Sequence, residues 1–157
     1  MDRIRGLFYF YTEWEKKMPL HFSDSKEIDV DQVLALYRHT DWAKDRTREE
    51  TGEILTRSSL VFGLWEGPRL VAFARVLTDF VARAGIYDVI VHPEAQKKGV
   101  GRMLIEQMLG YPSLRKVPVL HLLTKDKRLF YEKLGFVTAG ERGYSAMIFN
   151  REKEKKK

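Results

Sequence analysis

Residues 86–108 read IYDVIVHPEAQKKGVGRMLIEQM, and this stretch decides the fold. β-Branched and aromatic side chains dominate residues 86–91, a composition that suits a buried strand. His92-Pro93 ends that strand, because proline has no backbone N–H to donate. Apolar residues then recur at helical spacing over residues 100–108. We therefore predict a strand, a short glycine-containing loop and a helix in direct succession.

The loop before this helix has the features of an anion site. Backbone N–H groups at a helix N-terminus have no partner within the helix, and the positive end of the helix dipole adjoins them. Two glycines allow a ligand to approach the backbone closely, and three basic residues add positive charge. A pyrophosphate is the natural ligand for such a loop, although an ordinary glycine-containing turn would also fit the glycines alone. The residues are Gly99, Gly101, Lys97, Lys98 and Arg102.

Two motifs resemble a known family. Gln96-Lys97-Lys98-Gly99-Val100-Gly101 fits the Gln/Arg-x-x-Gly-x-Gly/Ala signature of the GCN5-related N-acetyltransferase (GNAT) superfamily. Downstream, Phe130-Tyr131-Glu132-Lys133-Leu134-Gly135-Phe136 resembles the segment that closes the acetyl-CoA site in that family. The resemblance covers residues 20–148 and implies an α/β (α+β) fold. That fold has a mixed, mostly antiparallel central sheet, a V-shaped splay between its two central strands and roughly four flanking helices.

The resemblance implies acetyl-CoA as the cofactor and assigns residues to it. The central strand would pair with the pantetheine arm, and a backbone amide at Val89 or Val91 would hold the thioester oxygen. Thr124 stands where the family often has asparagine, and Lys127 stands where it often has alanine and could reach a phosphate. The expected cofactor-binding residues are Val89, Ile90, Val91, Gln96, Lys97, Lys98, Gly99, Val100, Gly101, Arg102, Thr124 and Lys127.

The expected catalytic residues are Tyr131 and Asp88. Tyr131 matches the family tyrosine near the coenzyme A sulfur, and with an ordinary pKa of about 10 it could donate a proton to the thiolate. Asp88 is the one carboxylate within the central strand and is the expected base, with Asp79 as the reserve. Core packing for Tyr131 and a structural ion pair for Asp88 are the alternatives. His92 and His121 fit the role of base less well.

The acceptor is expected to lie near the connection between the first two helices, around residues 40–50. In the family this region overlies the acceptor site and varies with the substrate. Trp42, Arg46 and Asp79 are the expected substrate contacts, and Asp45 and Arg48 are further candidates. The alternative is a packing tryptophan among capping and surface residues.

Composition and charge exclude several classes of protein. The chain has 157 residues, 44% of them hydrophobic, and no cysteine, so a disulfide framework and a Cys-based zinc site are excluded and we assign no metal. Half of the net charge of +6 lies in residues 151–157. Nucleic acid is therefore not the expected partner. Apolar runs are too short to span a membrane, and we expect a cytoplasmic protein.

The chain divides into three parts. Residues 1–18 form an aromatic-rich extension, residues 19–150 a single acetyltransferase domain, and residues 151–157 a basic tail. A homodimer is left open. Within the domain we expect helices over residues 29–37, up to residue 57, after Gly101 and over 126–134. Strands are expected at 20–23, 60–65, 70–77, 86–91, 117–123, from 136 and at 146–149.

The expected function is acetyl-CoA-dependent N-acetyl transfer to a primary amine of a small molecule or peptide. The amine would attack the thioester directly in a ternary complex, a mechanism that needs no cysteine. The alternative is a non-catalytic acyl-CoA-binding or regulatory domain of the same fold, for which the departure at Thr124 gives some support.

Overall fold

The computed structural model describes residues 20–149. They belong to two compact units that divide after Leu123, and each unit is described by itself. The first contains every strand of the described chain, and the second contains one short helix and one 3-10 turn. The expected extension 1–18 and tail 151–157 lie outside the described residues. The three-part domain organisation therefore stays a prediction.

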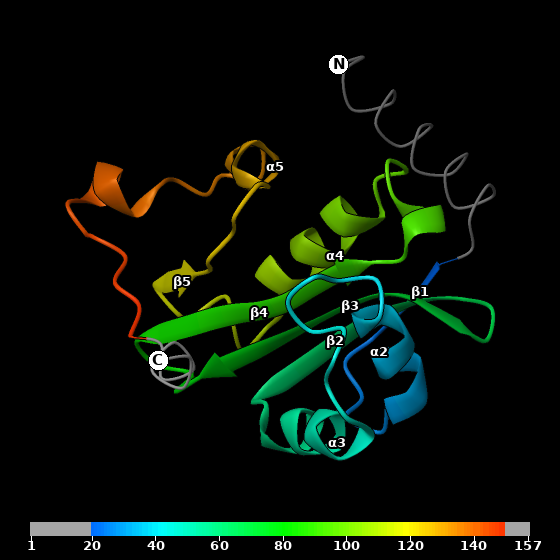
Figure 1. The fold of residues 1–157 in the computed structure, drawn as a ribbon. Helices are drawn as coiled ribbons and strands as arrows, with labels where there is room; N and C mark the ends of the chain where they lie inside the picture. Colours follow the sequence, from blue (N-terminus) through cyan, green and yellow to red (C-terminus); the bar gives the residue numbers. More distant parts are fainter. Residues whose placement is uncertain (1–19, 150–157) are drawn as a thin grey trace, which may run out of the picture. The chain divides into compact units, whose positions relative to one another are not determined.

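The elements of the first unit run from one strand through two helices and three consecutive strands to a 3-10 turn, a helix and a last strand (Figure 1). They are β1 (Leu20–Ser23), α2 (Val30–Tyr37), α3 (Arg48–Arg57), β2 (Leu60–Glu66), β3 (Arg69–Thr78), β4 (Arg83–Val91), η1 (Pro93–Ala95), α4 (Val100–Leu109) and β5 (Val119–His121). The second unit contains α5 (Arg128–Glu132) and η2 (Ala139–Arg142).

The five strands form one open sheet in the order β1-β2-β3-β4-β5. Neighbouring strands from β1 to β4 are antiparallel, whereas β4 and β5 are parallel. The parallel pair requires a crossover, and α4 supplies it. The sheet is thus mixed and mostly antiparallel, and with the four helices α2 to α5 it confirms the predicted fold class.

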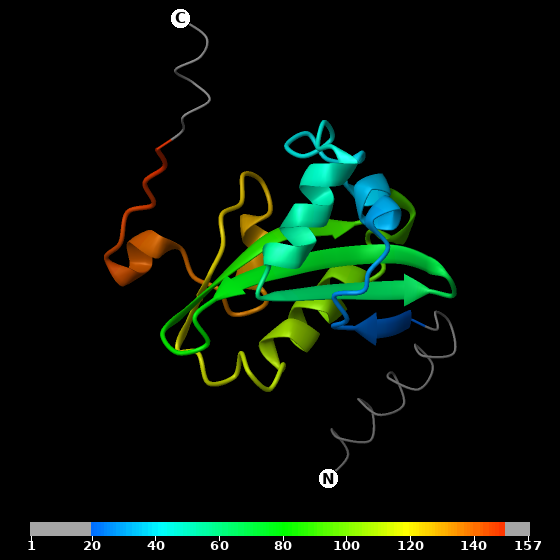
Figure 2. The same cartoon turned by 90° about the horizontal axis from the view of Figure 1, so that it is seen from below.

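Helices cover both faces of this sheet (Figure 2). On one face α2 and α3 bury a cluster that includes Val33, Leu36, Leu55 and Phe73. On the other face α4 contacts β2, β3 and β4 with a buried stripe at Leu104, Ile105 and Met108, residues spaced for one side of a helix. The central strands β3 and β4 are therefore covered on both sides, which fixes their positions.

Side chains at the helix starts explain where α2 and α3 begin. Asp29 is the N-cap of α2, and its carboxylate accepts the Asp31 N–H at 2.9 Å. Thr47 and Glu50 form a capping box at α3, in which each side chain accepts the backbone N–H of the other residue. The capping box consequently fixes the point at which the connection between α2 and α3 enters α3.

The C-terminal third of the chain differs from the prediction. The expected strand at 117–123 is reduced to β5, and the expected strands from residue 136 and at 146–149 are absent from the described residues. Apolar alternation predicts a strand's faces but not a partner for its backbone. Met147 and Ile148 are 90% and 73% exposed, so no packing surface supports a strand there. Gly135 does end the helical turn after α5, with φ of 91°.

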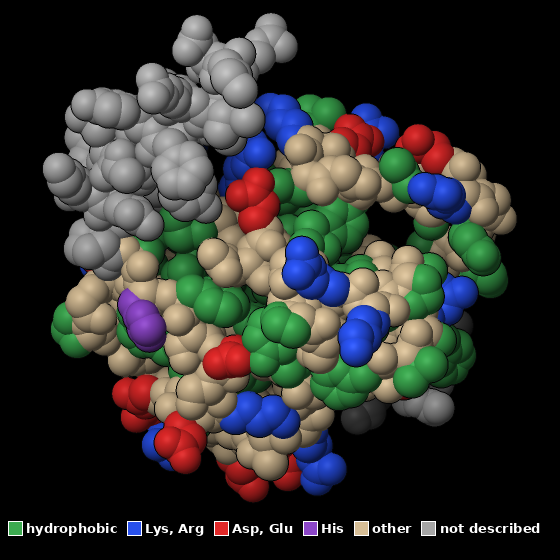
Figure 3. All heavy atoms as spheres, turned by 180° about the vertical axis from the view of Figure 1, so that it is seen from behind, with side chains coloured by type: hydrophobic (Ala, Val, Ile, Leu, Met, Phe, Trp, Pro, Cys, Tyr) green, Lys and Arg blue, Asp and Glu red, His purple; other side chains and the backbone are tan. Residues whose placement is uncertain are grey.

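No helix among residues 20–149 combines the length and apolarity that crossing a bilayer demands. On the face shown in Figure 3, lysine and arginine side chains are dispersed among acidic and apolar ones rather than gathered in one basic patch.

Candidate active site

Asp88 lies in a β-bulge of strand β4. Phe73 pairs with Ile90 and Arg75 pairs with Tyr87, so between these pairs one residue of β3 faces two residues of β4. Asp88 has a φ of 53°, in the left-handed region that few residues other than glycine adopt, although aspartate tolerates it better than most. This conformation places the Asp88 carboxylate on the side of the sheet that α2 covers.

Three donors converge on one oxygen of Asp88. The Tyr37 hydroxyl and Arg46 Nη1 each donate to Asp88 Oδ2 at 2.7 Å. Arg75 Nε donates to the same oxygen at 2.7 Å. The Asp88 side chain is 7% exposed, and the side chains of Arg46 and Arg75 are 24% and 13% exposed. A largely buried ion-pair network therefore joins α2, the α2–α3 connection, β3 and β4.

The protonation states in this network follow from its charges. Burial alone would raise the pKa of Asp88, but hydrogen bonds from Arg46 and Arg75 outweigh it and hold the pKa below its ordinary value. Burial, and then the Asp88 charge, raise the pKa of Tyr37 well above its ordinary value, so the tyrosine stays neutral. The cluster consequently contains one negative and two positive charges.

The α2–α3 connection positions Arg46. Thr40 Oγ1 donates to the Tyr37 carbonyl at 2.8 Å and accepts the Ala43 N–H at 3.1 Å, and the Arg46 N–H closes the next turn on the Ala43 carbonyl at 3.1 Å. The guanidinium of Arg46 lies 4.6 Å from the Tyr37 ring and 5.6 Å from the Trp42 ring. Hydrogen bonds within the loop and ring contacts thus direct Arg46 towards the bulge.

Strands β4 and β5 diverge soon after they meet. Their pairing comprises Arg83 with Val119, Ala84 with Leu120 and Gly85 with His121, and no further pair follows among the described residues. The side of β4 that faces β5 therefore has no β-strand partner from Ile86 onward. This is the predicted splay between the two central strands. An unpaired strand edge offers backbone N–H and C=O groups to an extended ligand.

The predicted loop follows directly after this edge. The Gln96 side chain donates to the Val91 carbonyl at 3.0 Å and so ties the loop to the end of β4. Lys97 and Gly99 have φ of 60° and 81°, and Gly99 precedes α4 without a side-chain cap. The N–H groups of Val100, Gly101 and Arg102 therefore have no hydrogen-bond partner among the described residues, whereas the Met103 N–H donates to the Gly99 carbonyl. A left-handed glycine followed by free amides fits a pyrophosphate.

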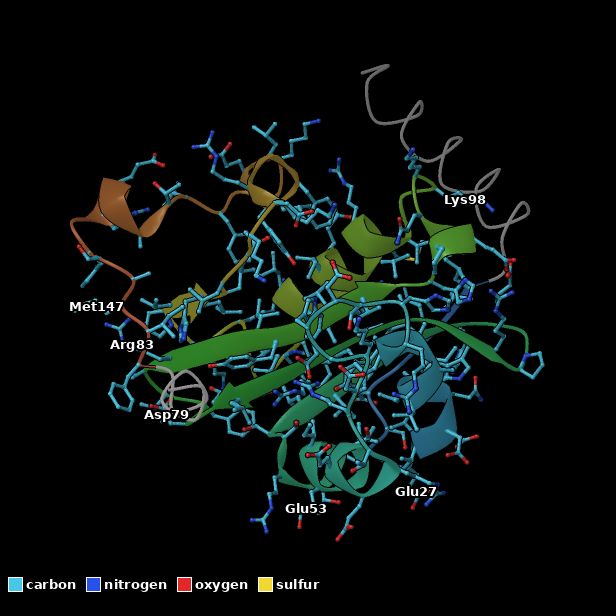
Figure 4. The ribbon with its side chains drawn as sticks, in the orientation of Figure 1. Glu27, Glu53, Asp79, Arg83, Lys98 and Met147 are labelled. Carbon is cyan, nitrogen blue, oxygen red and sulfur yellow. The ribbon has the colours of Figure 1, made fainter. Side chains whose placement is uncertain are left out.

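The basic residues around this loop differ in whether they form a salt bridge. Arg102 pairs with Glu106 one turn later on α4, at 2.7 Å. Lys97 and Lys98 have no salt bridge among the described residues. Lys98 lies near the start of α4, whereas Asp79 lies at the far end of the sheet (Figure 4). Lys97 and Lys98 are therefore the cations that the structure leaves available beside the loop.

His92 belongs to a separate polar group beside the loop. Arg69 Nη2 contacts His92 Nδ1 at 2.8 Å and Glu94 Oε2 at 2.6 Å, and the His39 ring lies 4.7 Å from the His92 ring. Burial and then Arg69 lower the pKa of His92. A cavity of about 300 Å³ adjoins this group, and its lining includes Arg69, Glu94 and Lys98. Acidic and basic side chains alternate there, so the cavity has no single charge preference.

Asp79 has a local structural role. Its Oδ1 accepts the backbone N–H groups of Val81, Ala82 and Arg83 at 2.8, 2.8 and 3.2 Å, which closes the turn between β3 and β4. These hydrogen bonds lower the pKa of Asp79. Asp79 stands at the opposite end of β4 from the loop and is not brought together with Asp88.

The second unit contains the remaining predicted residues. Tyr131 is buried on α5 between the rings of Phe130 and Phe136, with centroids at 5.0 and 5.6 Å. Burial raises the pKa of Tyr131 to about 12. Thr124 Oγ1 accepts the Lys127 N–H at 3.1 Å, which forms the turn before α5, and Lys127 Nζ lies 3.2 Å from Asp126.

The structure thus brings Asp88, Arg46 and Trp42 together, and separately it gathers the loop residues 96–102. The sequence analysis missed Tyr37 and Arg75. Tyr37 recurs at helical spacing with Val33 and Leu36, with which it is buried, and its hydroxyl gives no separate signal in the sequence. Arg75 could have been noticed, because a charged residue between apolar neighbours on a strand needs a partner.

Comparisons with known proteins agree with this geometry. Residues 57–138, a little over half of the chain, match the family described as the acetyltransferase (GNAT) domain. An uncharacterised N-acetyltransferase, ycf52, of Pyropia yezoensis is 29% identical over 123 residues, which are 75% of this chain and 70% of the relative. GCN5-related N-acetyltransferase 1, chloroplastic, of Arabidopsis thaliana is 28% identical over 132 residues, 83% of this chain and 66% of the relative.

A solved structure agrees as well. A protein from Xanthomonas campestris that is assigned to the GNAT acetyltransferases superposes with a TM-score of 0.72 at 28% identity, over 83% of this chain and 93% of that one. The splayed strands and the glycine turn lie within the segment that matches the family. On these grounds the chain belongs to the GNAT family of acetyltransferases.

Proposed function

We propose that the chain transfers an acetyl group from acetyl-CoA to a primary amine of a small molecule or peptide, by direct attack in a ternary complex. The observation that carries this proposal is the divergence of β4 from β5 immediately before the chain turns through Gly99 into α4. That succession offers an unpaired strand edge and a set of free amides to one elongated ligand. Membership of the family supports acetyl transfer as the reaction.

The unpaired edge of β4 and the loop before α4 each have a proposed role in binding acetyl-CoA. The first-turn amides at Val100 and Gly101, with Lys97 and Lys98, bind the pyrophosphate of coenzyme A. The backbone of residues 89–91 pairs with the pantetheine arm, and an amide there stabilises negative charge on the carbonyl oxygen. When bound, acetyl-CoA supplies an acyl thioester that an amine can attack. Thr124 and Lys127 remain proposed contacts of the same cofactor.

Tyr131 is the proposed general acid. Its pKa is raised to about 12, so it carries a proton at neutral pH, but the same shift makes it a weaker acid than an exposed tyrosine. The role of Asp88 as general base remains a prediction. Its contacts favour the alternative, in which Asp88 forms a structural ion pair. A carboxylate whose pKa is held below its ordinary value accepts a proton poorly. The amine would then enter the site in its neutral form.

The proposal is tested by two measurements on the full chain. Saturating acetyl-CoA should raise the melting temperature, because a ligand that binds only the folded state stabilises it. Release of free thiol should then depend on an added amine. Tyr131→Phe should keep the thermal shift and lose most of the turnover, whereas Tyr144→Phe, at an exposed position of the same unit, should keep both. Absence of any thermal shift at millimolar acetyl-CoA would overturn the proposal.

A non-catalytic acyl-CoA-binding domain is the second candidate, and a specific observation favours it. Asp88 and Asp79, the two carboxylates expected near the reaction, both accept several hydrogen bonds and both have lowered pKa values. Neither is therefore poised to accept a proton. This candidate predicts a thermal shift with acetyl-CoA and no thiol release with any amine in a broad panel.

The cytoplasmic location and the homodimer stay predictions. Several relatives are chloroplast proteins by name, such as the one from Arabidopsis.

A further inference from the structure

The network around Asp88 contains a surplus of positive charge in a place that is mostly shielded from water. Arg46 and Arg75 share a single carboxylate, and Tyr37 stays neutral because its pKa is raised. One charge therefore has no hydrogen-bonded counter-ion within the network, and the nearby Glu50 carboxylate is engaged in the capping box of α3. The Arg46 and Arg75 side chains are 24% and 13% exposed, so the surplus charge borders solvent and can attract a ligand of opposite charge.

Arg75 retains the donors that such a ligand needs. It uses Nε for Asp88, and its terminal Nη1 and Nη2 have no hydrogen bond to another residue of the described chain. Arg46 uses Nη1 alone for the same carboxylate. Within the described chain, the one fully buried side-chain polar atom that lacks a partner is Ser113 Oγ, so the free guanidinium nitrogens reach solvent. A planar guanidinium with two adjacent free N–H groups binds a carboxylate or phosphate in bidentate fashion.

Aromatic rings hold the two guanidiniums in place. The Arg75 guanidinium lies 5.1 Å from the Tyr87 ring, and the Arg46 guanidinium packs on Tyr37 and Trp42. Trp42 and Tyr87 are 49% and 39% exposed, so part of each ring faces solvent beside the network. The charged group is thus fixed in direction and is flanked by two rings that a ligand could contact.

Arg75 and Arg46 together form an anion receptor, and it lies next to the proposed reaction centre. Arg75 is on β3 opposite Tyr87 of β4, and the other edge of β4 is the one that β5 leaves unpaired. Neighbouring strands are about 4.8 Å apart, so an anion at Arg75 and an amine at the β4 edge would be a few bonds apart in one small molecule.

We infer that the acceptor is a small amine that also carries an anionic oxygen group, and that Arg75, together with Arg46, binds that group. Carboxylate and phosphate share this chemistry. The inference rests on the proposed acetyl transfer and narrows its acceptor class, since it excludes polyamines and simple neutral amines as preferred substrates. Arg75 becomes a specificity-determining residue that the sequence did not indicate.

Matched acceptor pairs test the inference by thiol release from acetyl-CoA. Phenylalanine is compared with phenylalaninamide and phenethylamine, and O-phosphoethanolamine with ethanolamine. In the wild type the anionic member of at least one pair should have a kcat/KM roughly tenfold or more above its neutral partner, the ratio expected for one charge-assisted hydrogen-bond pair. Preference within the first set identifies carboxylate, and preference within the second identifies phosphate.

Variants of Arg75 test whether this residue causes the preference for anionic acceptors. Arg75→Gln should reduce the ratio of kcat/KM for the anionic and neutral acceptors towards one. Arg75→Lys keeps the positive charge but loses the bidentate donor geometry, so it should retain part of the preference. Arg57→Gln on the exposed side of α3 should leave the ratio unchanged. An equal kcat/KM for anionic and neutral partners, or an unchanged ratio in both Arg75 variants, would overturn the inference while leaving acetyl transfer in place.

A binding measurement covers the case in which no amine is acetylated. With coenzyme A present, the anionic amine that the receptor fits should raise the melting temperature of the wild type and not that of Arg75→Gln, and the neutral partner should raise neither. A shift of this kind supports the anion receptor even though acetyl transfer has failed. Equal shifts with charged and neutral ligands, or none, would refute it.

Discussion

Tyr37 and Asp88 are 51 positions apart in the chain, yet the Tyr37 hydroxyl donates to Asp88 Oδ2 at 2.7 Å. The contact joins the last residue of α2 to the bulge of β4, and it is formed on a carboxylate that two arginines also bind. The bulge that redirects β4 is thereby attached to the helix that leads into the α2–α3 connection. Stability and acceptor binding should consequently respond to the same few residues.

Removing the Tyr37 hydroxyl should destabilise the protein. Tyr37 is fully buried, so in Tyr37→Phe no water replaces the lost donor, and we expect a loss of about 1.5–3 kcal/mol in the free energy of unfolding. Tyr111→Phe is a matched control, because the Tyr111 hydroxyl donates to Asp24 Oδ2 at 2.6 Å on the surface, where water can take its place. That variant should lose less than about 1 kcal/mol. Urea denaturation measures both, and equal losses would contradict the prediction.

Asp88 should make stability depend on pH in the acid range. Its pKa is lower in the folded protein than in the unfolded chain, where it is about 3.9. Its contribution is therefore complete above pH 4 and is lost as the pH falls through the lower folded value. At pH 7, Asp88→Asn should cost about 2–4 kcal/mol, because two arginines are left with no carboxylate.

The difference between wild type and Asp88→Asn isolates this group from the other carboxylates. It should be constant from pH 7 to pH 5 and should shrink below pH 4 as the wild type loses the same charge. Denaturant midpoints at each pH provide the measurement. A difference that stays constant down to pH 3 would mean that Asp88 is not held in its charged form.

Two glycines should respond in opposite ways to alanine. Gly99 has a φ of 81°, so Gly99→Ala forces a side chain into the left-handed region and should cost about 1–2 kcal/mol. Gly52 lies within α3, and a methyl group built there meets no atom within 4 Å. Gly52→Ala should therefore stabilise the protein by about 0.5–1 kcal/mol through the higher helix propensity of alanine.

The same pair separates stability from cofactor binding. Gly99→Ala should also weaken acetyl-CoA binding roughly tenfold in titration calorimetry, since the loop amides can no longer take their positions. Gly52→Ala should bind acetyl-CoA like the wild type. Unchanged affinity in Gly99→Ala would remove this turn from the proposed cofactor site.

The sequence predicted the local features of this protein better than its long-range ones. The strand, turn and helix over residues 86–108 follow from β-branched residues, His92-Pro93 and two glycines, each of which acts on its own neighbours. The network around Asp88 joins residues from four segments, and no local pattern relates Tyr37 or Arg75 to it. Asp88 could be singled out as a charge within a strand, but its partners required the register of β3 and β4. For the expected strand at 146–149 the apolar pattern is present, but residues 20–149 contain no strand that pairs with it.

Variants at the start of α3 test how Arg46 is positioned, because the N-cap of α3 directly follows Arg46. Thr47 Oγ1 accepts the Glu50 N–H at 3.1 Å, and Thr47→Ala removes this cap and should cost about 1 kcal/mol. Thr56 on the same helix donates to the Gly52 carbonyl at 3.0 Å within the helix, and no end of the helix depends on it. Thr56→Ala should therefore leave stability unchanged or raise it by a few tenths of a kcal/mol.

The two threonine variants should also differ in acceptor binding. A frayed start of α3 loosens the residue just before it, so Thr47→Ala should raise the KM for an anionic acceptor more than that for acetyl-CoA. Thr56→Ala should change neither. If the KM values for acceptor and cofactor rise together in Thr47→Ala, the cap supports the domain as a whole, and Arg46 is then not the residue through which α3 reaches the acceptor.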